Sequence, residues 1–67
     1  MTIRVNDQPR TVAEPASLLG LLHDLGVAER KGVAVAVNDA VVPRSQWTAR
    51  SLAESDRVLV IQATQGG

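Results

Sequence analysis

Few side chains of this 67-residue sequence could carry out chemistry. It has one histidine, His23, no cysteine, and no nucleophile–base pair or carboxylate pair at a spacing typical of catalysis. We therefore predict no catalytic side chain and no metal site, and His23 is interpreted as a surface residue. The feature that remains is the pair Gly66-Gly67, which follows the apolar run at residues 58–61. This pair is either a loose end of the chain or its working part.

The composition narrows the class of protein. Seven basic and seven acidic residues give a net charge of zero, whereas a nucleic-acid-binding domain normally carries a basic surface. Without cysteine, disulfides, iron–sulfur clusters and cysteine nucleophiles are excluded, and a single histidine does not supply a zinc site. Residues 2–4 are not an apolar signal sequence, and no apolar run is long enough to span a bilayer. We expect a soluble, cytoplasmic, single-domain protein that is monomeric on its own and has no nucleic-acid or membrane partner.

The first half of the chain predicts a hairpin and then a helix. Residues 2–6 alternate polar and apolar side chains, residues 6–9 are rich in turn formers, and residues 10–13 are suited to a returning strand. Ser17 is a suitable N-cap, and Gly26 is suited to end a helix in the left-handed conformation. Between them, leucines recur at helical spacing and form one apolar stripe, at Leu18, Leu21, Leu22 and Leu25.

The second half predicts further strands. Residues 33–37 alternate valine and alanine, so we expect the valines to face the core and Ala34 and Ala36 to face away from it. A turn at Asn38-Asp39 leads into a short strand at residues 41–42.

The last strand is expected at residues 57–63. We predict that Leu59 and Ile61 face the core and that Val58 and Val60 lie on the other side.

The order of these elements is ββαβββ. One helix with a single apolar stripe must cover one face of a mixed sheet, with the first and last strands as neighbours at its centre. This is an α+β arrangement of the β-grasp, or ubiquitin-like, type. We expect the β-grasp domain to span residues 1–63, with residues 64–67 as a flexible Gly-Gly tail.

Several stretches of the sequence resemble the ThiS family of sulfur carrier proteins in thiamine biosynthesis, over essentially the whole chain. The "VPRxxW" element at residues 42–47 is the most specific of them, whereas a terminal Gly-Gly is shared by all carriers of this superfamily. The stretches are Asn6-Asp7-Gln8, residues 35–38, residues 41–47 and residues 56–62 leading to Gly66-Gly67.

The resemblance implies a chemistry that acts on the end of the chain. In the family, a ThiF-like E1-type enzyme uses ATP to adenylate the C-terminal carboxylate, and sulfur from a cysteine desulfurase persulfide then displaces AMP. The resulting thiocarboxylate supplies sulfur to a ThiG-like thiazole synthase. The resemblance then implies that Gly67 is the residue that is adenylated and thiolated. It also implies that Gly66 threads into the partner's active site, because a residue without a Cβ avoids steric clashes in a narrow passage. The carrier is not an enzyme and binds no cofactor of its own.

We also predict where the body of the domain contacts its partners. The candidates are Val58, Val60, Ala34, Ala36 and Arg44. Trp47, as the only aromatic residue, is interpreted as part of the core and not as a partner anchor.

Three alternatives stay open. The chain could be a MoaD-type carrier that supplies sulfur for molybdopterin synthesis, a plain β-grasp interaction module, or a ubiquitin-like modifier.

Overall fold

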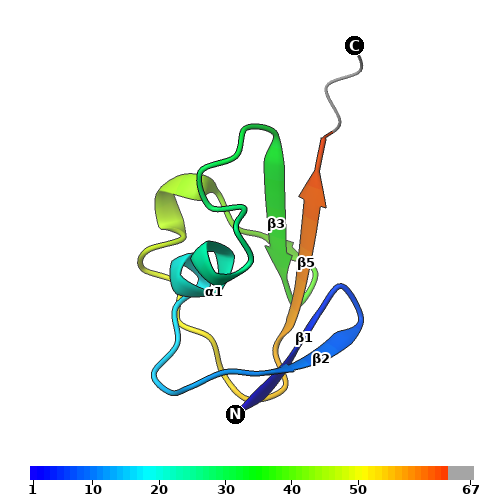
Figure 1. The fold of residues 1–67 in the computed structure, drawn as a ribbon, viewed down its shortest axis with the longest axis vertical. Helices are drawn as coiled ribbons and strands as arrows, with labels where there is room; N and C mark the ends of the chain where they lie inside the picture. The colour runs from blue at the N-terminus through cyan, green and yellow to red at the C-terminus, as the bar shows by residue number, and fades with distance from the viewer. Residues whose placement is uncertain (64–67) are drawn as a thin grey trace.

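The computed structural model describes residues 1–63, which form a five-stranded sheet with a helix across one face (Figure 1). The order of strands in the sheet is β2-β1-β5-β3-β4. No helix in this part of the chain is long and apolar enough to cross a membrane. The elements are β1 (Thr2–Val5), β2 (Gln8–Thr11), α1 (Leu18–Asp24), β3 (Val33–Val37), β4 (Ala40–Val41), the 3-10 helix η1 (Arg44–Gln46) and β5 (Arg57–Gln62).

The strand β5 occupies the centre of the sheet. It runs parallel to β1 on one side and antiparallel to β3 on the other, as the orange arrow between the blue and green strands of Figure 1 shows. The predicted adjacency of the first and last strands is therefore confirmed. β5 therefore has a hydrogen-bonded neighbour on each side.

Two short turns of the same kind build the hairpins. Asn6-Asp7 connects β1 to β2, and Asn38-Asp39 connects β3 to β4, with φ between 51° and 70° at all four residues. Asparagine and aspartate tolerate this left-handed conformation, and two such residues in sequence match the twist of a hairpin. The first turn is thus shorter than the predicted residues 6–9, and Gln8 already belongs to β2. Likewise β4 begins at Ala40, one residue earlier than expected.

The helix α1 begins and ends as the sequence predicts. The Oγ atom of Ser17 accepts a hydrogen bond of 3.0 Å from the Gly20 amide. A Cβ at position 20 would lie 3.2 Å from that Oγ atom, so glycine keeps the cap uncrowded. At the other end Gly26 has φ +77°, and the Val27 N–H donates to the Leu22 carbonyl at 3.0 Å. This pairing closes the last turn and satisfies a carbonyl that the helix leaves free.

The core lies between α1 and the inner face of the sheet. Its largest fully buried side chains come from both layers and from the chain after η1, and they are Trp47, Ile3, Leu18, Leu22, Val35 and Val37. Trp47 is 1% exposed, and its indole N–H donates to the Val42 carbonyl at 2.9 Å. Its assignment to the core is confirmed.

The orientation predicted for β5 is wrong. Val58 is 2% exposed and Val60 packs against the core, whereas Leu59 and Ile61 are 48% and 55% exposed. Strand periodicity makes alternate residues face opposite sides, but it does not say which set faces inward. The register decides this, because Val58 pairs with Val5 of β1 and Val37 of β3, and both of those residues are buried.

Candidate partner-docking face

The face of the sheet opposite α1 carries a group of apolar side chains. Ala34 of β3 pairs with Ile61 of β5, and Ala36 lies between Leu59 of β5 and Val41 of β4. We call these five residues the outer apolar face. The exposed fraction is 48% for Leu59, 55% for Ile61 and 76% for Val41.

The small alanines explain why this face is so exposed. Ala34 and Ala36 have side chains too short to cover the larger residues beside them, so Leu59 and Ile61 stand above the sheet. A contiguous apolar group of this kind on a small domain is typical of a protein–protein contact. The outer apolar face is therefore the part of the described chain best suited to dock a partner.

The structure sorts the predicted contact residues into two groups. Ala34 and Ala36 lie on the outer apolar face as predicted, with Ala34 exposed and Ala36 half-buried. Val58 is buried and Val60 is partly buried against the core, so neither lies on the outer apolar face. Leu59 and Ile61 are the residues of β5 that lie on the outer apolar face. The position of Arg57 in the sequence could have indicated this orientation. Arg57 shares their side of the strand, and an arginine is seldom buried.

Arg44 is used inside the molecule. Its guanidinium donates to the Ala28 carbonyl at 2.6 Å and to the Arg30 carbonyl at 2.7 Å, and it lies 4.6 Å from the centre of the Trp47 ring. These contacts tie the loop after α1 to η1. They give Arg44 a structural role, and contact with a partner stays a prediction.

Charged residues border the outer apolar face near the start of β5. Arg57 forms an ion pair of 2.8 Å with Asp39, and Arg4 donates to the Asp7 carbonyl at 2.9 Å. A shallow cavity of about 190 Å³ lies among them. Both partners of the ion pair are largely exposed, so it contributes little to stability but offers charges at the rim of the face.

The strand β5 also connects this face to the end of the chain. Ala63, the residue after β5, donates its N–H to the Gly32 carbonyl at 2.8 Å. Gly32 has φ +73°, and a Cβ there would lie 3.2 Å from the Ala63 Cβ. Glycine therefore lets the chain before β3 approach the end of β5 closely. Gly66 and Gly67 lie outside the described residues.

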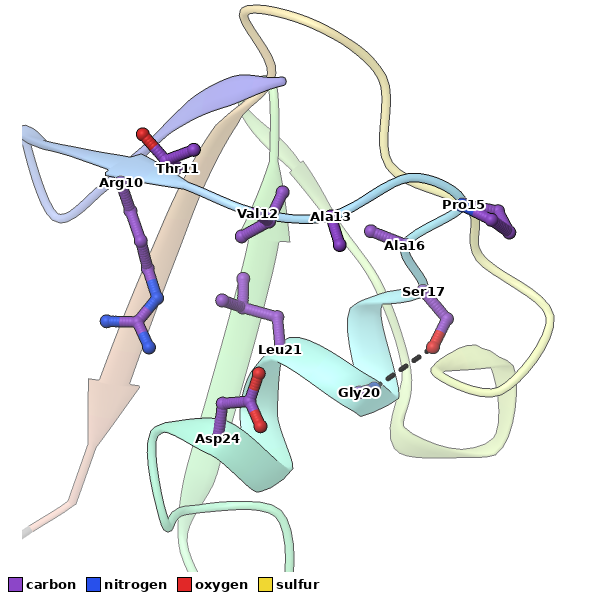
Figure 2. A pocket seen from close by; sticks show the side chains of 10 residues that line it. All are labelled: Arg10, Thr11, Val12, Ala13, Pro15, Ala16, Ser17, Gly20, Leu21 and Asp24. Carbon is purple, nitrogen blue, oxygen red and sulfur yellow. Dashed lines mark hydrogen bonds between the residues drawn. The ribbon is translucent and has the colours of Figure 1, made fainter.

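A second cavity lies on the helix side and has a different lining. It has a volume of about 400 Å³ between the β2 edge, the following loop and α1, and in Figure 2 the side chains of Val12 and Leu21 point toward each other across it. The charged residues that line it are Arg10 and Asp24. This pair does not combine a nucleophile with a general base. Within residues 1–63, no three potential metal ligands come together, and His23 is exposed.

The topology of the fold defines the class of protein. A helix across a mixed sheet of order β2-β1-β5-β3-β4, with β1 and β5 parallel, is the ubiquitin-like β-grasp fold. Within that class the chain belongs to the ThiS family, whose model matches residues 3–67.

Individual relatives agree with this assignment. The chain is 34% identical to the sulfur carrier protein ThiS of Escherichia coli K12, and the match covers all of both chains. It is 40% identical over 67 residues to a thiazole synthase of Magnetococcus marinus, but it spans only 20% of that protein.

Solved structures support the same fold. The crystal structure of the thiamine biosynthesis protein ThiS from Geobacter metallireducens superposes with a TM-score of 0.83 at 33% identity, over the full length of both chains. The solution structure of a thiamine biosynthesis protein from the same organism gives a TM-score of 0.82 and covers 88% of that chain.

Proposed function

We propose that this chain is the sulfur carrier for thiazole formation in thiamine biosynthesis. The observation that carries the proposal is the match to the Escherichia coli sulfur carrier ThiS over the whole of both chains. The ThiS family model, which extends through residue 67, supports it.

The reacting group in this proposal is the α-carboxylate of Gly67. An E1-type adenylating enzyme of the ThiF kind joins it to AMP with release of pyrophosphate from ATP. The terminal sulfur of a cysteine desulfurase persulfide then attacks the acyl carbon and expels AMP, and a thiol reductant cleaves the resulting acyl disulfide to leave the thiocarboxylate. The carrier is thus a co-substrate and not an enzyme, and the ATP belongs to its partner. Gly66, without a Cβ, suits passage into a narrow nucleotide site.

The outer apolar face supplies the docking energy in this proposal. Ordering a terminal segment inside a partner costs about 1–2 kcal/mol for each residue that becomes fixed. Burying Leu59 and Ile61 against the partner offsets part of that cost, at about 25 cal/mol per Å² of apolar surface.

We further propose that a thiazole synthase receives the sulfur. The Magnetococcus marinus protein supports this, because a segment similar to the whole of our chain makes up 20% of a thiazole synthase there. Joining a carrier to its acceptor in one chain raises their effective concentration, which fits two proteins that must meet.

Intact-mass measurement tests the proposal. The full chain is incubated with ATP, the adenylating enzyme, cysteine, the desulfurase and a thiol reductant such as dithiothreitol. We expect an acyl-adenylate first. The final product should be heavier than the unmodified chain by the exchange of one oxygen for one sulfur. A variant that lacks Gly67 should keep its circular dichroism spectrum and form neither product.

Two results would count against this reading. If the wild-type chain forms no adenylate with the adenylating enzyme from its own organism, the carrier function is wrong. If the variant without Gly67 loses its fold, the end of the chain has a structural role that we have misassigned.

A further inference from the structure

The strand β1 is too short to accompany β5 along its whole length. Only Arg4 and Val5 are in register with β5, opposite Arg57 and Val58. The last backbone bond on this side joins the Asn6 N–H to the Val58 carbonyl at 2.9 Å. Beyond this point the chain turns away at Asn6-Asp7, so Val60 lies past the end of its neighbour.

The side chain of Asn6 takes over where β1 ends. Its Oδ1 accepts from the Val60 N–H at 2.8 Å, and its Nδ2 donates to the Val60 carbonyl at 3.3 Å. One amide side chain thus meets both backbone groups of Val60, which a longer parallel β1 would bond through two of its residues. Residues 6 and 60 are 54 positions apart in the chain, so this contact exists only in the folded domain.

The second hairpin turn provides a close counterpart. Asn38 has the same φ of 51° as Asn6. Its Oδ1 accepts from the Arg57 N–H at 2.9 Å, and its Nδ2 donates to Asp56 Oδ1 at 2.9 Å. Both turn asparagines therefore make two side-chain hydrogen bonds to the β5 region. Asn38 holds the residue where β5 begins, and Asn6 holds the part from which the chain continues toward Gly67.

The turns alone do not require these amides. A residue with φ near 51° is accommodated at least as well by glycine, which has no Cβ to strain the left-handed conformation. Glycine at either position would keep the turn and remove only the side-chain bonds. The two roles of each asparagine can therefore be separated.

We propose that Asn6 is a positioning residue for the transfer reaction. This inference rests on the proposed carrier function. Val60 lies between Leu59 and Ile61, two residues of the outer apolar face. By holding the Val60 backbone, Asn6 fixes that face relative to the end of β5. When a partner docks on this face, the end of β5 then has a single position relative to that partner.

Without the Asn6 amide, the part of β5 beyond Val58 has hydrogen-bond partners only on its β3 side. More conformations of the strand end become accessible, and only a fraction of them presents the chain correctly to a docked partner. The apparent affinity falls by that fraction, and a misplaced reacting group slows the chemical step as well.

The experiment compares three variants of the full chain: Asn6→Gly, Asn38→Gly and Asn6→Asp. Each is assayed for kcat/KM of adenylate formation with the adenylating enzyme, for its thermal unfolding, and for amide hydrogen exchange at residues 60–63. Aspartate tolerates the left-handed conformation and can still accept from the Val60 N–H, but it cannot donate to the carbonyl.

We expect the two glycine variants to lose similar stability, because each loses two exposed side-chain hydrogen bonds. Only Asn6→Gly should lower kcat/KM, by about tenfold, and speed exchange of the Val60 amide. Asn38→Gly should stay within about twofold of the wild type, and Asn6→Asp should recover part of the loss.

Equal kcat/KM values for Asn6→Gly and Asn38→Gly would overturn the positioning role while leaving the carrier function intact, since the wild-type chain would still be adenylated. The same holds if Asn6→Gly exchanges Val60 faster but reacts at the wild-type rate. If the wild-type chain itself forms no adenylate, the carrier function fails and the positioning role fails with it.

Discussion

Arg44 shows how one side chain can join separate parts of a small domain. Its guanidinium bonds to two carbonyls of the loop after α1 and covers the ring of Trp47. A planar group with several fixed donors suits this task, because it can meet two acceptors and an aromatic face at once. These contacts give the arginine of the "VPRxxW" element a role in the folded domain.

Substitution Arg44→Lys tests this role. Lysine keeps the charge but cannot bond both carbonyls in the same plane, so we expect a loss of about 1–2 kcal/mol in the free energy of unfolding. Urea denaturation followed by circular dichroism measures it. The rate of adenylate formation per folded molecule should not change. Unchanged stability together with a slower reaction would instead assign Arg44 to a partner contact.

At the scale of the element, the two faces of β5 have different roles. Val58 and Val60 pack inward, while Leu59 and Ile61 belong to the outer apolar face. The strand RVLVIQ is apolar on both sides because one side stabilises the domain and the other is available to a partner. Neighbouring residues of one strand should therefore respond differently to the same substitution.

We expect Val58→Ala to lower the free energy of unfolding by about 2 kcal/mol, because it removes two buried carbons and leaves a cavity. Leu59→Ala should change stability by less than about 0.5 kcal/mol. It should instead lower kcat/KM with the adenylating enzyme by about fivefold or more, because it removes an exposed apolar side chain of the docking face. Chemical denaturation and adenylation kinetics on the same two proteins make the comparison. The opposite pattern would show that the outer apolar face does not dock this enzyme.

At the scale of the whole molecule, the domain depends on a small core. A chain of 67 residues has few means of stabilisation, and without cysteine it has no disulfide. Domains of this size gain only about 3–5 kcal/mol from their core. Trp47 is the largest fully buried side chain of the described residues, so it accounts for a large share of that energy.

Trp47→Ala should therefore prevent stable folding at 37 °C, because such a substitution costs about 3–5 kcal/mol. Trp47→Phe should cost less, about 1–3 kcal/mol, because it keeps an aromatic ring but leaves the Val42 carbonyl without its indole donor. Thermal unfolding followed by far-UV circular dichroism distinguishes the two. A Trp47→Ala protein with a wild-type midpoint would show that the core tolerates the missing ring.

Local patterns made much of this fold predictable. Ser17, the leucine stripe and Gly26 specify the start, the buried side and the end of α1 through contacts within a few residues. Asn-Asp pairs specify the hairpin turns in the same way. The ThiS family resemblance was also visible in the sequence, and the family match confirms it.

Only the tertiary structure decided what each face of β5 does. In a strand that is apolar on both sides, the two possible orientations satisfy the same pattern, and burial depends on the register with β1 and β3. The contacts of Asn6 with Val60 and of Arg44 with Ala28 likewise join residues far apart in the chain. The sequence by itself determined the local elements and the family, because both depend on patterns among residues that are close together in the chain. The docking face and the support of β5 arise only where distant stretches meet.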